Sequence, residues 1–397
     1  MESTTETDSS EPCVDFTEIY PDPTNSAISM TIFGIIYTHI FILGLLGNIS
    51  MMFLTLRHRH LQTVQNIFIL NLAMSDVIIC LLSVPITPIT NALKQWFFGE
   101  YICHLLPFIQ AVSVFVSTFS LSAIALDRYN LVIRPHANII KPKSAIKIAT
   151  ILWIIAAFVS APYCYFMKIE NYPGYCGQFC TERWPNPLVR RGYALVLLCC
   201  QFLIPFAIMS FCYSVIFSRL RERANSKIRK LDERSQLLES SRGPEAKTNE
   251  HCSVTKVPSK DQQKAQLLAK QRRTTTILAS MVLIFGLSWL PHNVITLIIE
   301  YDENILHIDA LNYTYIVSTI AHSIAMTNNV ANPVLYAWLN PSFKEILIKL
   351  FWYIMPSKRH QTTNSTTTTT TQSTRLIPNR ESVIRLNSDF NNDEKLV

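Results

Sequence analysis

Four residues between Cys103 and Tyr129 could do chemistry along one line of a helix. They are Cys103, Gln110, Ser117 and Arg128. At about 100° per residue, steps of 7, 7 and 11 residues nearly close whole turns, so the four fall within about 40° of one line. The stretch rises about 38 Å, enough to cross a bilayer. It predicts a helix with a thiol at one end, uncharged polar groups at mid-depth and an acid–arginine pair at the other end.

A second candidate is Asp76, a carboxylate inside the apolar run 65–93. Ionisable groups at mid-membrane depth are energetically costly and are candidates for function by default. Polar groups from other runs could join it: Asn48, Ser117, Asn328, Asn329 and Asn332. Oxygen ligands suit a small hard cation such as Na⁺. The alternative is a hydrogen-bonded structural network without an ion.

Prolines inside apolar runs mark a third candidate region. Pro205, Pro291 and Pro333 each remove a backbone hydrogen bond and kink a helix. Trp289 lies two residues before Pro291, and Phe285 lies one helical turn before Trp289. A bulky pair beside a kink could switch between two packings. The alternative is an aromatic pair that fills a bent core.

Catalysis has no support in the sequence. It shows no nucleophile–base–acid set, no metal cluster and no CxxC pairs at zinc-site spacing among its ten cysteines. We therefore expect no enzyme, and no cofactor beyond the candidate allosteric Na⁺.

Seven apolar stretches are long enough to cross a bilayer and would position these residues. They are residues 29–56, 65–93, 101–132, 145–168, 188–220, 270–299 and 311–339. The 397-residue chain is 49% hydrophobic and 16% charged, a composition typical of a membrane protein. The sequence predicts an all-α membrane protein, a bundle of seven transmembrane helices.

Basic residues predict the orientation of the bundle. Arg57 and Arg59 follow the first stretch, Arg134 follows the third, and fifteen Lys/Arg lie between Arg219 and Arg273. Positive loops face the cytoplasm, so the N-terminus is expected outside and the C-terminus inside. Because the basic residues belong to these loops, the net charge of +7 does not indicate nucleic-acid binding. Whether Cys13 or Cys176, both on the outer, oxidising side, is disulfide-bonded stays open.

The chain divides into four predicted regions. Residues 1–28 are an extracellular tail, and residues 29–340 form the bundle, including a mobile cytoplasmic loop at 221–263. Residues 341–355 form a short amphipathic eighth helix at the membrane surface. Residues 356–397 form a disordered cytoplasmic tail whose Ser/Thr residues could be phosphorylated.

The chain resembles the rhodopsin-like (class A) G-protein-coupled receptors. The resemblance rests on motifs in the family's order over about 300 residues. They are Gly47-Asn48, Asn71-Leu72-Ala73 with Asp76, Trp96-x-Phe98-Gly99, Cys103, Asp127-Arg128-Tyr129, Trp153, Pro205 with Tyr213, Phe285 with Trp289-Leu290-Pro291, and Asn332-Pro333-x-x-Tyr336.

The resemblance implies a role for each motif. Cys103 is expected to pair with a cysteine after the fourth span, and Arg128 to face a heterotrimeric G protein. Tyr213 and Tyr336 are expected to move toward Arg128 on activation. Na⁺ is expected at Asp76, Ser117, Asn328 and Asn332. The chain has Gln271 where many relatives carry an acid for Arg128, so Asp127 is expected to hold this arginine at rest.

Further residues resemble the neuropeptide Y/neuropeptide F receptor branch. The stretch Cys180-Thr-Glu-Arg-Trp184-Pro185 matches a loop signature of that branch and makes Cys180 the expected partner of Cys103. Polar positions of the branch that contact an amidated peptide end are matched by Thr87, Gln110, Gln201 and His322. Glu300 falls where the branch uses an acid for the peptide's penultimate arginine, although Asp302 or Glu303 could serve instead. A solvated rim charge and a core histidine are the alternatives for Glu300 and His322.

The expected function is a plasma-membrane receptor for a peptide ending in Arg-Phe-NH₂ or Arg-Tyr-NH₂. The expected partners are this peptide, a G protein of the Gi/o class, arrestin and membrane lipids, with no nucleic acid. A tachykinin-like or luqin/RYamide-like peptide is the alternative ligand. A transporter or channel is disfavoured by the odd number of spans and the single deep carboxylate.

Overall fold

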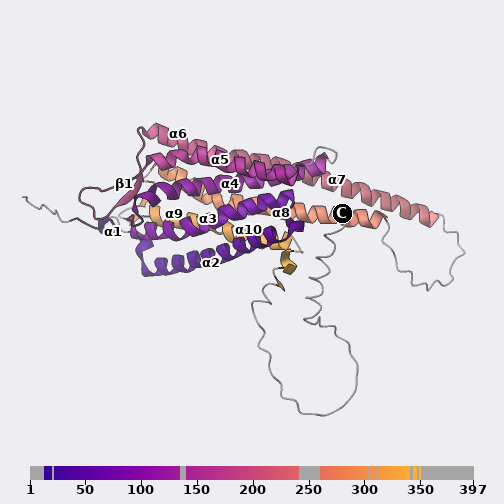
Figure 1. Ribbon diagram of the computed structural model, residues 1–397, viewed down its shortest axis with the longest axis horizontal. Coiled ribbons are helices and arrows are strands. Elements are labelled where there is room, and N and C mark those ends of the chain that lie inside the picture. The colour runs from indigo at the N-terminus through magenta and orange to yellow at the C-terminus, as the bar shows by residue number, and fades with distance from the viewer. Residues whose placement is uncertain are drawn as a thin grey trace, which may run out of the picture. The chain divides into compact units, whose positions relative to one another are not determined.

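Long helices lie side by side in a bundle (Figure 1). The computed structural model describes residues 13–19, 22–134, 140–240, 260–302, 305–308, 311–339, 343–346 and 348–349. Six helices in this part of the chain are long and apolar enough to cross a membrane. They are α2 (Ala27–Arg57), α3 (Val64–Leu93), α4 (Gly99–Ile133), α5 (Pro142–Phe166), the run formed by α6 (Pro187–Leu198), the π-helical turn η3 (Cys199–Leu203) and α7 (Ile204–Ser240), and α8 (Lys260–Tyr301).

The seventh predicted span is present as two shorter helices, α9 (Thr314–Met326) and α10 (Asn328–Leu339). The break falls at Thr327, whose hydroxyl donates a hydrogen bond to the carbonyl of Ile324 at 2.6 Å. Such local bonds compete with the regular backbone pattern of a helix. The predicted seven-helix bundle is therefore confirmed, with its last span broken in the middle.

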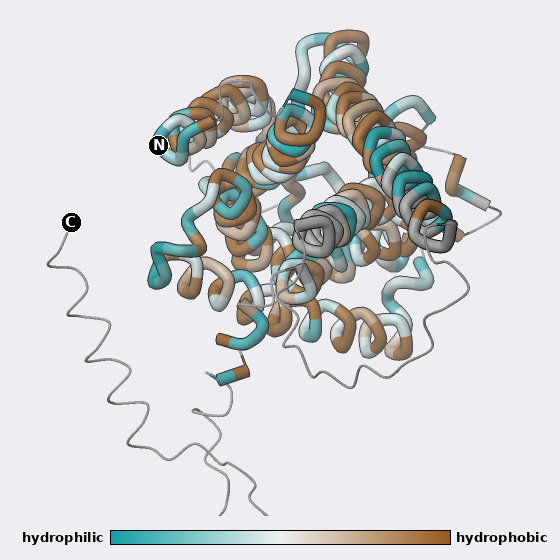
Figure 2. Tube along the Cα trace, turned by 90° about the vertical axis from the view of Figure 1, so that its right-hand side faces the viewer, coloured by the Kyte–Doolittle hydropathy of each residue, from teal (hydrophilic) through white to brown (hydrophobic). Residues whose placement is uncertain are grey.

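Helix α4 lies at the centre of the bundle, packed against α3, α5 and α7. Small buried hydroxyl residues on α4, such as Ser113 and Ser120, let neighbouring helices approach closely. Many large apolar side chains on the helices are exposed, and Figure 2 shows hydrophobic residues, in brown, along much of the length of the helices. Large exposed side chains include Phe53, Phe158 and Leu287. An apolar exterior is what a lipid environment requires.

Polar side chains join three helices at positions that the motifs marked. Trp153 on α5 donates from its indole nitrogen to Asn71 Oδ1 on α3 at 2.7 Å. Asn71 in turn donates to the Ser120 hydroxyl on α4 at 2.8 Å. Because both partners of each bond are satisfied, these contacts fix the relative position of α3, α4 and α5.

Both ends of the predicted loop 221–263 are helical. Helix α7 continues to Ser240, and α8 begins at Lys260, so the loop prediction is wrong for both ends of that range. Residues 221–240 are rich in Glu, Lys, Arg, Gln and Leu, which favour helices. Arg229 and Glu233 add an ion pair one turn apart, at 3.5 Å. Residues 241–259 lie outside the described residues.

One end of the bundle, here called the hairpin end, carries the antiparallel strands β1 (Met167–Glu170) and β2 (Phe179–Glu182). It also carries α1 (Phe16–Ile19), a short 3₁₀ turn at Pro23–Asn25, and the pair β3 (His307–Ile308) and β4 (Leu311–Asn312). The opposite end carries a 3₁₀ turn at Arg59–Leu61 and the extended ends of α7 and α8. Of the predicted eighth helix, residues 343–346 and 348–349 are described and helical. The predicted tail 356–397 lies outside the described residues.

Candidate ligand-binding site

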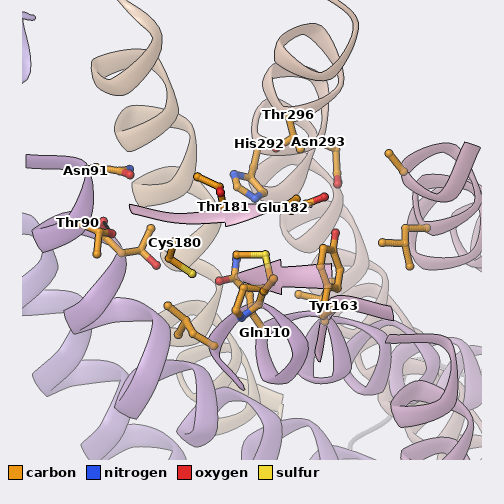
Figure 3. A pocket seen from close by; sticks show the side chains of 18 of the residues that line it. Thr90, Asn91, Gln110, Tyr163, Cys180, Thr181, Glu182, His292, Asn293 and Thr296 are labelled. Atoms are coloured by element: carbon orange, nitrogen blue, oxygen red, sulfur yellow. Dashed lines mark hydrogen bonds between the residues drawn. The ribbon is translucent and has the colours of Figure 1, made fainter. Parts of the chain in front are cut away.

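A cavity of about 480 Å³ opens at the hairpin end, between α3, α4, α8 and the hairpin (Figure 3). Its polar lining is mostly uncharged: Thr87, Thr90, Asn91, Gln110, Thr181, Gln201, Asn293 and Thr296. Lys94 and Glu182 add one charge of each sign. The cavity therefore offers neutral hydrogen-bonding groups over most of its wall and isolated charges at particular points.

Three of the five predicted ligand residues line this cavity. Thr87, Gln110 and Gln201 are part of its wall, whereas Glu300 and His322 are not. Glu300 is engaged with another side chain of the protein, and His322 lies behind the wall. The structure thus brings the predicted neutral residues together and sets the predicted acid and histidine apart from the cavity.

His322 is connected to Gln110 through the hydroxyl group of Ser83. The Ser83 hydroxyl donates to Gln110 Oε1 at 3.0 Å and lies 3.2 Å from His322 Nε2. The other ring nitrogen of His322 is 2.8 Å from the Tyr37 hydroxyl. Both nitrogens of this buried ring have partners, so His322 can fix Ser83 and, through it, the orientation of the Gln110 amide.

Gln201 owes its place to the π-helical turn η3, which ends just before Pro205. Proline lacks a backbone donor, and π-helical turns are often found at functional sites. Gln201 donates from Nε2 to the carbonyl of Ala111 on α4 at 2.9 Å. No hydrogen bond to its amide oxygen is found within the described part of the chain, so this oxygen can accept one from a bound molecule.

Glu182, Arg190 and Glu300 form a charge cluster beside the cavity. Arg190 Nη2 lies 2.7 Å from a Glu300 carboxylate oxygen, and Arg190 Nε lies 3.9 Å from Glu182. Glu182 also accepts a hydrogen bond from the Trp184 indole at 2.7 Å. Burial raises the pKa of Glu182, while Trp184 and Arg190 act against this shift. We call Glu182, in the cavity wall, half-paired, because its contact with Arg190 is as long as 3.9 Å. Glu300, in contrast, pairs closely with Arg190 at 2.7 Å.

The hairpin is held over the cavity by the predicted disulfide between Cys103 and Cys180, which the structure confirms. In the hairpin, Cys180 pairs with Ile169 across the strands. Trp184 stacks on Phe166 with ring centroids 4.0 Å apart. These contacts fix the last residue of β2, Glu182, at the cavity wall. The Glu-x-Trp spacing noted in the sequence thus has a geometric role.

A second disulfide, Cys13–Cys176, ties the N-terminal segment to the hairpin loop. The Val14 backbone bonds to Gly174 and Cys176. Phe16 packs against rings of the cavity wall, with centroid distances of 6.0 Å to Phe179 and 6.1 Å to Tyr315. The question that the sequence left open is answered, because Cys13 and Cys176 are bonded to each other. The predicted tail 1–28 is therefore ordered over its described part.

The predicted carboxylate–amide cluster lies at mid-depth. Asp76 is buried and accepts a hydrogen bond from Asn332 Nδ2 at 2.8 Å. Ser117 bonds to the Ser75 hydroxyl at 2.8 Å. Asn48 donates to the carbonyl of Asn329 at 2.9 Å. Four buried side-chain oxygens of this cluster lack a hydrogen-bond partner within the described residues: Asn48 Oδ1, Asp76 Oδ1, Asn328 Oδ1 and Asn332 Oδ1. Unsatisfied oxygens of this kind fit the donor set that a Na⁺ ion needs.

The aromatic pair of Trp289 and Phe285 begins at the cavity wall. Trp289 lines the cavity, and its ring centroid is 6.1 Å from that of Phe285. On its other side Trp289 meets His292 edge-on at 5.7 Å, and His292 contacts His322 at 5.8 Å. Pro291 and Pro333 lie inside α8 and α10 as predicted.

The acid–arginine pair lies toward the opposite end of α4. Arg128 Nη2 is 3.6 Å from Asp127 Oδ2, so the pairing expected in the absence of an acid at Gln271 is present. Gln271 is exposed. Tyr213 and Tyr336 are buried, and Tyr336 packs on Phe343 at 4.8 Å. Tyr129 contacts Phe211 on α7 at 6.1 Å.

Comparison with known proteins decides the family. Residues 47–336 match the family described as "7 transmembrane receptor (rhodopsin family)". The chain belongs to this family. This family consists of receptors and is not an enzyme family. The chain is accordingly a multi-pass membrane protein.

Named relatives of this receptor include neuropeptide receptors. Neuropeptide receptor npr-1 of Caenorhabditis elegans is 46% identical over 351 residues, covering 85% of this chain and 76% of that protein. Human neuropeptide Y receptor type 2 is 28% identical over 347 residues, covering 84% and 81%. The neuropeptide F receptor of Drosophila melanogaster is 29% identical over 321 residues, covering 78% and 60%.

Among the cavity residues that carry a charge or an imidazole, sequence reasoning missed Lys94, Glu182 and His292. Glu182 stood inside the loop motif, but the motif was used to choose a cysteine. His292 follows Pro291 directly, and its place near the kink was the available signal. Lys94 carried no signal, because a single lysine at the end of an apolar run is typical of a membrane boundary.

Proposed function

We propose that this receptor binds an amidated peptide of the neuropeptide Y/neuropeptide F type, ending in Arg-Phe-NH₂ or Arg-Tyr-NH₂, and signals to a heterotrimeric G protein. The observation that carries the proposal is the cavity wall, where neutral amides and one half-paired carboxylate meet. Gln110 and Gln201 can exchange hydrogen bonds with a terminal carboxamide, which is itself both donor and acceptor. The peptide class is taken from the relatives, which are a neuropeptide receptor, a neuropeptide Y receptor and a neuropeptide F receptor.

Glu182 is the carboxylate that we assign to the peptide's arginine. A guanidinium forms strong paired hydrogen bonds with a carboxylate. Glu182 lines the cavity and is 3.9 Å from Arg190, a distance that leaves room for a closer partner. For Glu300 to play this part, the peptide would have to displace Arg190 from its 2.7 Å contact. Glu300 then contributes by holding Arg190 away from Glu182.

A Na⁺ ion at mid-depth is part of the proposal. Asp76, Ser117, Asn328 and Asn332 would hold it, and it would neutralise a buried carboxylate. The buried oxygens without hydrogen-bond partners support this assignment.

We place the hairpin end outside the cell, at the plasma membrane, and the Arg128 end in the cytoplasm. The basic residues around Arg219–Arg273 and the two disulfides at the other end support this orientation. The G protein would meet Arg128, Tyr213 and Tyr336, and the Gi/o class follows from the branch. Arrestin would bind the phosphorylated tail, and membrane lipids would surround the apolar helix faces.

A panel of synthetic peptides applied to cells that express the full chain tests the proposal. We expect Arg-Phe-NH₂ or Arg-Tyr-NH₂ peptides to trigger a Gi/o response that cells without the receptor do not give. A response only to tachykinin-like or luqin-like peptides would move the receptor to another branch. Ion flux or solute uptake in proteoliposomes without a G protein would indicate a channel or transporter.

A further inference from the structure

Lys94 ends helix α3 in a conformation that buries its ammonium group in the cavity wall. Its backbone lies in the left-handed region, at φ 53°, and its N–H bonds to the Thr90 carbonyl at 2.8 Å. The residue is only 3% exposed. Left-handed backbone is uncommon for residues other than glycine. The turn therefore directs the long charged side chain of Lys94 inward. A lysine at the membrane boundary usually extends its ammonium group into solvent instead.

The Lys94 ammonium lacks a hydrogen-bond acceptor within the described part of the chain. Its Nζ lies 5.2 Å from the ring centroid of Tyr315, an attractive cation–π arrangement. Asp22 is the nearby acid, and it raises the pKa of Lys94 against the larger lowering effect of burial. Asp22 Oδ1 accepts from the Thr24 N–H, while Oδ2 has no hydrogen-bond partner among the described residues. A buried ammonium without an acceptor is unfavourable unless a further group binds it.

The two charged residues of the cavity wall, Lys94 and Glu182, come from different elements of the fold. Lys94 directly follows the last turn of α3, which carries Asn91, whereas Glu182 is the last residue of β2. Figure 3 shows Asn91 and Glu182 on these separate elements. A peptide held by both points would carry a basic residue toward Glu182 and an acidic residue toward Lys94.

We propose that Lys94 is a specificity-determining residue that binds an acidic side chain of the peptide, N-terminal to its amidated end. This inference rests on the proposed function. A carboxylate entering the cavity would supply the acceptor that the ammonium lacks, and the neutral floor around Gln110 and Gln201 would remain free for the terminal amide. Peptides with a neutral or basic residue at the same place would leave the ammonium unpaired or repelled.

Charge-matched peptides test the proposal. The probes are synthetic peptides of one sequence ending in Arg-Phe-NH₂, with Glu, Gln or Lys placed in turn at each of the positions three to six residues before the terminal Phe. They are assayed for G-protein activation on cells that express the full chain. At one position we expect the Glu peptide to be about tenfold more potent than its Gln partner, the ratio given by one charge-assisted hydrogen bond. The Lys peptide is expected to be weaker still.

Variants then assign that preference to Lys94. Lys94→Gln should remove the preference for Glu, and Lys94→Glu should transfer it to the Lys peptide. Lys168→Gln, at an exposed lysine of β1, is the matched control and should keep it. Asp22→Asn tests whether Lys94 only holds the N-terminal segment. In that case Asp22→Asn and Lys94→Gln would both weaken all three peptides alike, which would contradict the proposal.

The wild-type receptor alone can also overturn the inference. Active peptides with equal potency at every scanned position would refute the role of Lys94 and leave the proposed function intact. Inactivity of every peptide, whatever its charge, would refute the proposed function and this inference with it. A preference for Glu that persists in Lys94→Gln would assign it to another residue.

Discussion

Glu182 and Glu300 share one arginine, Arg190, yet their surroundings give them different roles. Glu300 is paired at 2.7 Å, whereas Glu182 is 3.9 Å away and faces the cavity. We predict that Glu182→Gln weakens an arginine-containing amidated peptide about ten- to one-hundred-fold, because a charge-assisted hydrogen bond is lost. The measurement is competition binding on membranes with two peptides, one containing arginine and one with citrulline in its place. Equal losses for both peptides would contradict direct pairing.

The same carboxylate makes binding depend on pH. Burial raises the pKa of Glu182, so the group takes up a proton at a higher pH than an exposed glutamate. The protonated form does not attract a guanidinium, so affinity for the arginine peptide should fall as the pH is lowered from 7.4 toward 5.5. This part of the pH dependence should be absent in Glu182→Gln and for the citrulline peptide. A Glu182→Gln receptor with the same profile as wild type would assign the effect elsewhere.

Asp76 is the residue on which the ion proposal depends. It is buried, and its Oδ1 has no hydrogen-bond partner within the described chain. We predict that Asp76→Asn removes the effect of Na⁺ on agonist binding, measured at constant ionic strength with N-methylglucamine chloride as the replacement salt. Wild-type receptor should lose agonist affinity as Na⁺ rises. Unchanged sodium sensitivity in Asp76→Asn would exclude this carboxylate from an ion site.

At the scale of elements, α7 and α8 approach closely at Gly286. A Cβ atom built at Gly286 would overlap the ring of Phe206 on α7, which directly follows Pro205. Since no side chain fits there, the glycine lets the aromatic ring pack against the kinked helix. The contact sets the spacing between α8, which carries Trp289, and α7, which directly follows the η3 turn that carries Gln201.

We predict that Gly286→Ala lowers the stability of the detergent-solubilised receptor by about 1 to 3 kcal/mol, the usual penalty for overpacking. The measurement is the thermal unfolding midpoint. Phe206→Ala should restore part of the loss when combined with Gly286→Ala, because it removes the ring that clashes. Gly34→Ala is the matched control, since Gly34 has no atom within 4 Å of a built Cβ. An equal effect of both glycine substitutions would contradict the packing argument.

The Cys13–Cys176 disulfide attaches the N-terminal segment covalently to the loop of the hairpin. Cys13 and Cys176 are 163 residues apart in sequence, and Phe16 packs on two rings of the cavity wall. We predict that Cys13→Ser, Cys176→Ser and the double variant each weaken peptide binding about tenfold and to the same extent, because releasing the segment adds an ordering cost to binding. Surface staining should remain normal. Additive losses in the double variant would show that the two cysteines act separately.

Long apolar runs were predictable because lipid imposes length and composition on every span, as for α3, expected at 65–93 and found at Val64–Leu93. The Cys103–Cys180 pair and the neutral cavity residues followed from motifs. The break at Thr327 and the extension of α7 to Ser240 did not, since each depends on local hydrogen bonds or propensities that hydropathy does not contain. The inward turn of Lys94 and the pairing of Glu300 with Arg190 depend on contacts between distant segments.

At the scale of the whole molecule, packed groups lead from Gln110 in the cavity wall to the aromatic pair beside the kink of α8. Gln110 contacts Ser83, which contacts His322, and rings then continue through His292 and Trp289 to Phe285. Beyond them lie Tyr213 and the Asp127–Arg128 pair. Kinked helices with bulky residues at the kink can adopt two packings. A peptide end that displaces Trp289 or His292 would therefore favour a different position of α8 at the opposite end.

The most direct test of this account compares a peptide ending in Arg-Phe-NH₂ with the same peptide ending in a free carboxylate. The assay is guanine-nucleotide exchange on purified Gi/o by the purified full-length receptor in lipid nanodiscs. Gln110 and Gln201, the groups assigned to the peptide end, are uncharged, so a terminal carboxylate held by them would lack a counter-charge, and we predict that the amide is at least about one-hundred-fold more potent. Equal potency of amide and acid, or no exchange with either, would contradict it.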